Sequence, residues 1–307
     1  MPTTPSEHAP RGLLDGLLDI QQSDGGWAYS TNSSWTEPTC YAILALRWAG
    51  GTDTTRPDAT RKDRAICRAG EWLARRQRRD GGWSPGSAVE QSTHVTSLSI
   101  LALSGLDGYE DITDHGVHWI LSQAGAESSV WARTARLVMG TQSGATQHAG
   151  WPWFPGAAAW VIPTSFAIFA LLKQRNGRYA KDIEARVQDA RSFLLSRRCP
   201  DHGWNHGGLF RTGERPSSYP ETTGIALLAL QGTAISDIAP SIRCAEQHAR
   251  EPRSSEGACW LRLGLAAHGR DAAPPSGKYR DWTVNQVALG ILTQTGKEGS
   301  NPFIDHV

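Results

Sequence analysis

The 307-residue sequence predicts an all-α fold, a single (α/α)6 barrel (toroid) of about six helical hairpins around a central cavity. Two observations support this prediction. A turn motif recurs along the chain, and each copy is followed by a polar linker and an apolar helix. Amphipathic helices lie between the apolar ones, so two kinds of helix alternate. This alternation is typical of an outer ring of helices that meets water and an inner ring that is buried on both sides.

The turn motif is Gln-x-x-Asp-Gly-Gly-Trp, at residues 21–27 and again at 77–83. A degraded copy lies at 198–204, and a weaker one ends at Trp151. The Gly-Gly pair makes a tight turn, because glycine adopts positive φ at little steric cost. We therefore expect each outer helix to end at this turn and the Trp to pack between adjacent hairpins.

The expected inner helices share a frame of Thr, six residues and then Leu. They are 39–46, 96–103, 164–171 and 223–230, with degenerate members at 258–265 and 285–292. Their outer partners are expected to begin near Arg11, Arg64, Asp114, Asp182, Asp237 and Ala272. We assign residues 11–296 to one toroid domain, 1–10 to a disordered N-terminal tail and 297–307 to a C-terminal tail.

The turn strings resemble the QW repeats of squalene–hopene and oxidosqualene cyclases. The apolar helices, with their Ala-Leu endings, also resemble repeats of protein prenyltransferase β-subunits. This resemblance, which spans residues 12–293, implies an (α/α)6 barrel with a ligand cavity. The sequence departs from the cyclases in having length for one barrel and no Asp-x-Asp-Asp motif, which in that family protonates an alkene or epoxide. Glu37 and Cys40 match the Asp-x-Cys part of the prenyltransferase zinc site poorly.

In the cyclase resemblance, the proton-donating Asp falls two residues before the shared Thr. That position holds Glu37, His94, Glu221 and Glu256 in four of the repeats. We predict these four as catalytic residues at one depth around the cavity mouth, with Glu37 or Glu221 giving or taking a proton and His94 tuning it. A helix N-terminus lowers the pKa of a Glu, so a proton donor here also needs burial or a neighbouring carboxylate. In the alternative interpretation, each Glu only complements its helix dipole.

Aromatic residues stand two positions further back in the same frame. The predicted substrate-binding residues are Trp35, Trp160, Tyr219, Trp153, Trp282 and Cys40. Aromatic faces stabilise cations through their quadrupole, and they also stack on sugar rings and flat ligands. No cofactor or metal is assigned, although inward-facing Glu, His and Glu side chains would suit a divalent metal.

The composition limits the partners of this protein. A net charge of +1 indicates no nucleic-acid partner, and no apolar stretch is long enough for a membrane-spanning helix. Five scattered cysteines without a C-x-x-C pair predict a reduced protein in the cytoplasm. A second subunit or a peripheral membrane contact stays open.

The sequence favours a terpene cyclase-like lyase or isomerase that binds an isoprenoid-type small molecule in the cavity. One alternative is a different carboxylate- or metal-dependent enzyme on the same barrel, acting on a glycan or another polar ligand. The other is a non-catalytic toroid that binds a ligand or a protein. A closed apolar pocket favours a terpenoid, whereas an open polar cleft with carboxyl groups roughly 5–9 Å apart favours glycosidase-like chemistry.

Overall fold

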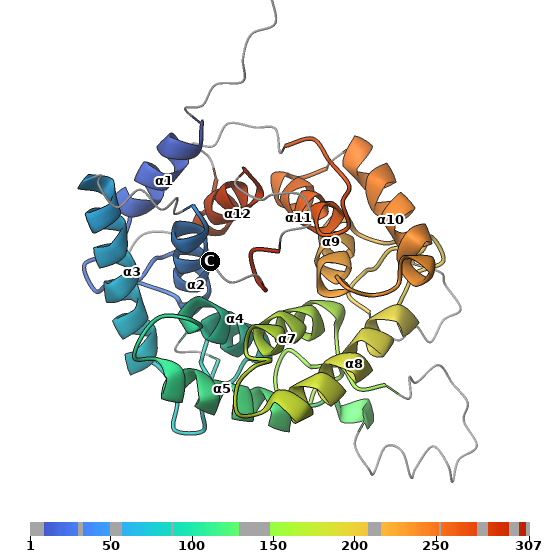
Figure 1. The fold of residues 1–307 in the computed structure, drawn as a ribbon, viewed down its shortest axis with the longest axis horizontal. Coiled ribbons are helices and arrows are strands. Elements are labelled where there is room, and N and C mark those ends of the chain that lie inside the picture. The colour runs from blue at the N-terminus through green and yellow to red at the C-terminus, as the bar shows by residue number, and fades with distance from the viewer. Residues whose placement is uncertain are drawn as a thin grey trace, which may run out of the picture.

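The computed structural model describes residues 9–29, 33–49, 57–86, 89–128, 148–207, 216–251, 253–274, 282–294 and 301–304. Within these ranges the regular structure is helical, and β pairing is limited to isolated bridges. The helices form two concentric rings, which confirms the predicted all-α toroid (Figure 1). Within the same ranges, no helix combines the length and the apolarity that crossing a bilayer needs.

The inner ring consists of α2 (Thr36–Trp48), α4 (Thr93–Leu103), α7 (Val161–Lys173), α9 (Pro220–Ala229), α11 (Ser255–Ala266) and α12 (Val284–Gln294). Each inner helix packs against the next, and α12 packs against α2 to close the ring. The outer ring contains α1 (Ala9–Asp19), α3 (Pro57–Arg75), α5 (Glu110–Ser122), α8 (Ala180–Ser196) and α10 (Ile235–Arg250). A short 3-10 turn, η1 (Ala126–Ser128), follows α5.

The sixth outer helix, expected near Ala272, differs from the prediction. Residues 271–274 are not helical, and 275–281 lie outside the described residues. Helix α1 packs against α12 instead, so the two ends of the chain supply the last hairpin of the ring. The expected tail at 1–10 overlaps α1, which begins at Ala9, and its other residues are not described.

The inner helices are apolar nearly all round because both of their sides are buried. Every residue of α4 is buried, and its two Ser hydroxyls bond backbone carbonyls one turn earlier, Ser97 with Thr93 and Ser99 with Val95. Helices α9 and α11 approach so closely that a Cβ on Gly264 would lie 2.4 Å from the Gly224 carbonyl oxygen. Glycine is therefore required where these two backbones touch.

The repeated turn fixes how each outer helix joins the next inner helix. In the first copy, the Trp27 backbone N–H donates to Thr39 Oγ1 (2.9 Å) and its indole N–H donates to the Leu17 carbonyl (2.8 Å). Gln21 Nε2 donates both to the Gly25 carbonyl and to Ala65 O on α3, which ties adjacent hairpins together. Gly25 has φ 100°, as the turn chemistry predicts.

The C-terminal segment lies inside the ring rather than outside the domain. Residues 301–304, which were assigned to a tail, are buried at the ring centre (Figure 1). The Phe303 ring stacks on Phe169 and Trp260, with ring centroids 5.2 and 5.6 Å apart. Asn301 holds the segment by donating to Gln231 Oε1 (3.0 Å). A short segment without helical periodicity gave no indication of this burial.

The Phe303→Ala variant tests whether this segment belongs to the core. Removing a ring that is 1% exposed should lower the free energy of unfolding by about 3–5 kcal/mol. The matched control is Phe154→Ala, since Phe154 is 56% exposed and its loss should change stability by no more than about 0.5 kcal/mol. Urea denaturation measures both, and equal effects would contradict the assignment of Phe303 to the core.

Candidate functional site

The four predicted catalytic residues all lie in the first turn of an inner helix. Glu37 is on α2, His94 on α4, Glu221 on α9 and Glu256 on α11. The residue before each of these helices has an extended backbone, so the chain enters the ring in the same way in each hairpin. The repeat frame therefore translates into equivalent positions on four inner helices, at what we call the ring mouth.

Glu37 is held by groups from three other parts of the chain. His94 Nε2 lies 3.6 Å from Glu37 Oε1, and Asn285 Nδ2 on α12 donates to the same oxygen (3.3 Å). The Tyr29 hydroxyl donates to Oε2. Burial raises the pKa of Glu37, but the hydrogen bond and charge of His94, together with the Tyr29 hydroxyl, outweigh burial and lower the pKa below its usual value. Glu37 is therefore an ionised carboxylate near neutral pH.

His94 brings an unpaired polar atom to the same place. Its side chain is buried between rings, with centroids 4.4 Å from Phe166 and 5.3 Å from Trp153. Among the described residues, neither His94 Nδ1 nor Asn285 Oδ1 has a hydrogen-bond partner, although both atoms are buried. Buried polar atoms without a protein partner are uncommon, and they favour a polar ligand at this position.

The second pair of carboxyl groups lies at the start of α9 and α11. Ser254 Oγ donates to Glu221 Oε1 (2.6 Å), and a Cβ on Gly257 would lie 2.9 Å from that same oxygen. The Glu221 carboxylate therefore rests against the first turn of α11, beside Glu256. Glu256 keeps an exposed side. The protein around it still removes part of its hydration, and this effect, followed by the charges of Glu221 and Glu37, raises the pKa of Glu256.

Glu256 and Glu37 thus differ in pKa in the direction that an acid–base pair needs. The pKa of Glu256 is raised while the pKa of Glu37 is lowered. Opposite shifts of this kind assign the proton-donating and proton-accepting roles in carboxylate enzymes. The sequence predicted that Glu37 or Glu221 gives or takes the proton, and the charge environment favours Glu256 as the donor.

Most of the predicted aromatic residues do lie around the mouth. Trp35 and Tyr219 are 37% and 45% exposed. The His206 ring lies between Trp160 and Tyr219, with centroids 5.9 and 5.3 Å away. Trp282 packs over α12, where a Cβ on Gly290 would lie 2.7 Å from its ring.

Cys40 does not share this exposure. Its side chain is fully buried, and its thiol lies 3.6 Å from Ser99 Oγ between α2 and α4. Cys40 lies one helical turn beyond Glu37, where α2 already packs against α4, and this packing excludes solvent from the thiol.

Sequence reasoning missed Tyr29, Asn285 and His206 as mouth residues. Tyr29 and His206 lie in linkers after the turn Trp, whose paths no periodicity predicts. Asn285 was recognised only as the degenerate counterpart of the shared Thr. At this position Asn replaces the Thr of the other repeats, which indicated a different hydrogen-bond partner. That partner is Glu37.

Below the mouth, aromatic rings fill the ring centre. Tyr41 and Phe166 each pack against Trp260, with centroids 6.5 and 5.8 Å apart. Phe303 completes this cluster from the C-terminal segment, 6.0 Å from Phe166. The described part of the ring centre is therefore apolar and occupied by the chain itself.

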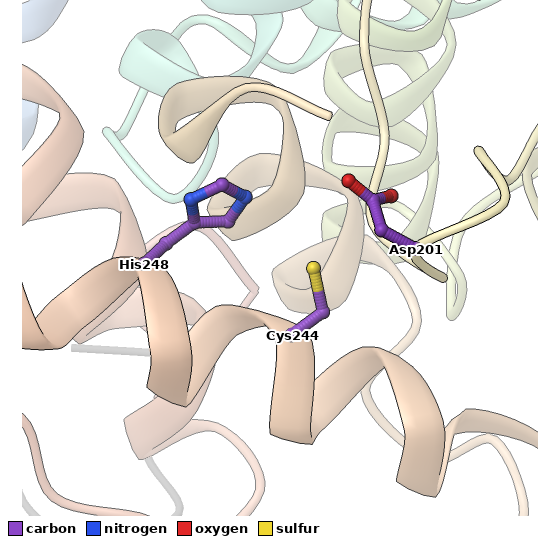
Figure 2. Close-up of side chains that lie close together, drawn as sticks. All are labelled: Asp201, Cys244 and His248. Carbon is purple, nitrogen blue, oxygen red and sulfur yellow. The ribbon is translucent and has the colours of Figure 1, made fainter. Parts of the chain in front are cut away.

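The described residues at the mouth do not bring three metal-ligand atoms together, so they do not form the metal site that the sequence left open. In that part of the chain, the three side chains that bring metal-ligand atoms together are Asp201, Cys244 and His248, whose atoms lie within 4.8 Å of one another (Figure 2). Asp201 lies in the turn after α8, and the other two are on α10.

The sequence matches no protein-family model and no curated protein. Solved structures do resemble it. An endo-β-1,4-glucanase of family GH8 from an Achatina fulica gut metagenomic library is 13% identical, with a TM-score of 0.59 and coverage of 96% of this chain and 99% of that one. An α-1,6-mannanase, GH76A of Salegentibacter sp. HEL1_6, is 9% identical, with a TM-score of 0.57 and coverage of 93% and 97%. The type II terpene cyclase MstE from Scytonema is 12% identical, with a TM-score of 0.41 and coverage of 95% and 98%. The first two likenesses support the α/α toroid fold.

The opposite pKa shifts predict opposite pH dependences of stability. The raised pKa of Glu256 means that the folded state holds its proton more tightly than the unfolded state does, so Glu256 lowers the free energy of unfolding as pH rises above the ordinary Glu pKa of 4.5. Glu256→Gln should therefore raise the melting temperature at about pH 8 and change it little at about pH 4.

Glu37→Gln should have the opposite effect on the melting temperature. The lowered pKa of Glu37 stabilises the fold above the unfolded value, and this stabilisation is lost as pH falls through the folded value. The variant should therefore be less stable than the parent at about pH 8, with the difference shrinking at acidic pH. Thermal melts across pH measure both variants, and shifts of the same sign would contradict the assignment.

Proposed function

We propose that this protein is an acid–base hydrolase that cleaves a glycosidic or similar acetal bond at the ring mouth, with Glu256 as the acid and Glu37 as the base. The observation that carries the proposal is that the Glu37 carboxylate, held against the buried imidazole of His94, and the exposed Glu256 both lie in the first turn of an inner helix, where the charge of Glu37 acts on Glu256. Two carboxyl groups in distinct environments are the minimal equipment for this reaction.

The reaction divides between the two groups. Glu256 donates its proton to the bridging oxygen, and the bond from that oxygen to the acetal carbon breaks. Glu37 accepts a proton from the water whose oxygen attacks the acetal carbon. Water is thereby added across the broken bond, and proton exchange with solvent returns both carboxyl groups to their starting states. Asn285 and Tyr29 hold Glu37 in place through hydrogen bonds, and the His94 imidazole lies against the same carboxylate.

The surroundings favour a polar substrate over an apolar chain. Trp35 and Tyr219 are partly exposed aromatic residues, and aromatic rings of this kind can stack on a sugar ring. The unpaired atoms His94 Nδ1 and Asn285 Oδ1 can bond hydroxyl groups. The names of the GH8 glucanase and the GH76 mannanase refer to glycans, and this fold-level analogy points to the same substrate class.

Activity on a panel of β-glucan and α-mannan oligosaccharides, followed by reducing-end release, tests the proposal. Glu256→Gln and Glu37→Gln should each lower kcat by about 10²–10⁴-fold, because each loses one proton-transfer group. The wild-type rate should fall at both acidic and alkaline pH, and the alkaline decline should be absent in Glu256→Gln, which has no acid left to deprotonate.

Glu184→Gln on the outer helix α8 is the matched control, since it makes the same chemical change at an exposed position away from the mouth. Full activity of Glu256→Gln, or an equal loss in the control, would overturn the assignment of roles.

A second candidate is the binding and isomerisation or cyclisation of an isoprenoid-type substrate. The aromatic cluster at the ring centre favours it, because rings such as Phe166 and Trp260 can stabilise a carbocation. This reaction also needs a dry chamber, and Phe303 now fills that space. It would therefore require the C-terminal segment to move aside.

Native mass spectrometry with geranylgeranyl diphosphate and squalene separates the two candidates. Under the second candidate, Phe303→Ala should bind a polyene roughly 10–100-fold more tightly than the parent, because it vacates an apolar site of ring size. Polyene binding that is absent from both proteins would eliminate this candidate while leaving the hydrolase proposal standing.

A further inference from the structure

Three different metal-ligating side chains converge at the degraded copy of the turn motif, residues 198–204. Cys244 and His248 are one helical turn apart on α10, so they share a face, and Asp201 approaches from the turn after α8 (Figure 2). The Ser218 hydroxyl marks their common point: it lies 2.9 Å from Asp201 Oδ2, 2.8 Å from His248 Nε2 and 3.6 Å from Cys244 Sγ. The three ligand atoms are therefore already aimed at one centre.

The first repeat shows what this position holds elsewhere in the ring. There the Asp24 carboxylate accepts from Ser34 Oγ (2.6 Å) and from the Trp72 indole N–H (2.9 Å) on the next outer helix. Arg68, one turn before Trp72, donates to the Ser23 carbonyl of the same turn (2.7 Å). An Arg and a Trp thus tie the turn to the neighbouring helix through hydrogen bonds.

The later repeat keeps the acid and the serine but changes both partners on the helix. Cys244 and His248 on α10 take the positions that Arg68 and Trp72 hold on α3. Both pairs are four residues apart, and in both a fully buried Ala, Ala69 or Ala245, follows the first member. A pair of donors has been replaced by a thiol and an imidazole. In this turn the Ser218 hydroxyl bridges Asp201 and His248, in place of the direct bond that Trp72 donates to Asp24 in the first repeat.

The geometry points to a transition-metal site, best suited to Zn²⁺, that is formed by Asp201, Cys244 and His248 and ties the turn to α10. Mixed carboxylate, thiolate and imidazole ligands suit Zn²⁺, whereas Ca²⁺ and Mg²⁺ prefer oxygen ligands alone. The side chains keep partial solvent access, so water can supply the fourth ligand. Tetrahedral Zn²⁺ sets its ligand atoms roughly 3.3–3.8 Å apart, and atoms now within 4.8 Å need small rotamer adjustments to reach that spacing.

The site also has a connection to the ring mouth. Ser218 directly precedes Tyr219, the N-cap residue of α9, and Glu221 follows in the first turn. A metal that fixes the turn beside Ser218 would therefore fix the entry of this inner helix. The site is separate from the inner-helix pair Glu37 and Cys40, which the prenyltransferase resemblance compared with a zinc site.

Cobalt titration of the purified full-length protein, freed of any affinity tag, tests the site. Co²⁺ substitutes for Zn²⁺ and gives a thiolate-to-metal absorption band that reports a Cys ligand directly. We expect one equivalent of Co²⁺ to give this band, and one equivalent of Zn²⁺ to abolish it. Binding should also raise the melting temperature, because metal binding to the folded state alone stabilises it.

Cys244→Ser should remove the thiolate band, and His248→Ala and Asp201→Asn should each weaken binding by more than the roughly 10–100-fold typical for loss of an outer-shell partner. Cys67→Ser is the matched control, because Cys67 is exposed on α3 and outside the cluster. Circular dichroism checks that each variant is folded.

A band that persists in folded Cys244→Ser, or that disappears in Cys67→Ser, would place the metal elsewhere and overturn the assignment. The absence of any thiolate band in the wild type would also overturn it, and would identify the cluster as a hydrogen-bond network centred on Ser218.

Discussion

The hydrogen bond from each turn Trp to a Thr hydroxyl is the interaction on which the rest of the ring depends. It recurs at Trp27, Trp83, Trp151 and Trp204, at distances of 2.9, 2.9, 2.8 and 3.0 Å. In each copy the indole N–H also donates to a carbonyl of the preceding outer helix. The Trp therefore joins the end of one helix to the start of the next, and sets the depth at which α2, α4, α7 and α9 begin. Residues just ahead of the Thr consequently share one level of the ring, and this is where the mouth forms.

Several acidic residues at one level of the ring repel one another, and the mouth offsets this repulsion at Glu37 but not at Glu256. Glu37 is accommodated as a carboxylate by His94, Tyr29 and Asn285. For Glu256, the hydrogen bond with Trp260 does not offset burial and the charges of Glu221 and Glu37, so its pKa is raised. Identical side chains in equivalent repeats thus acquire different protonation behaviour, because their neighbours differ. A symmetric ring becomes an asymmetric site, which is what proton transfer between two groups requires.

Divergence between repeats also explains the other distinctive features of the molecule. Where the later turn replaces a glycine with His202, the backbone still has φ 69°, a conformation that the equivalent Gly25 adopts more easily. The same turn has exchanged its Arg and Trp partners for Cys244 and His248. At the ring centre, the closed inner helices leave a space that Phe303 fills by stacking on Phe169. In each case the repeat framework is retained while one copy takes on chemistry that the others lack.

The sequence by itself determined the helical hairpins, the turn geometry and the level of the mouth residues, because these follow from helical periodicity and from hydrogen bonds between nearby residues. Glu37, His94, Glu221 and Glu256 could be selected from one repeat frame. The tertiary structure decided which carboxyl group has its pKa raised and which has it lowered, since that depends on neighbours from other hairpins, such as His94 beside Glu37. It likewise decided that Cys40 is buried, that Phe303 enters the ring, and that Asp201 meets Cys244 and His248. Ring closure brings these segments together, and no local pattern encodes which side chains then come into contact.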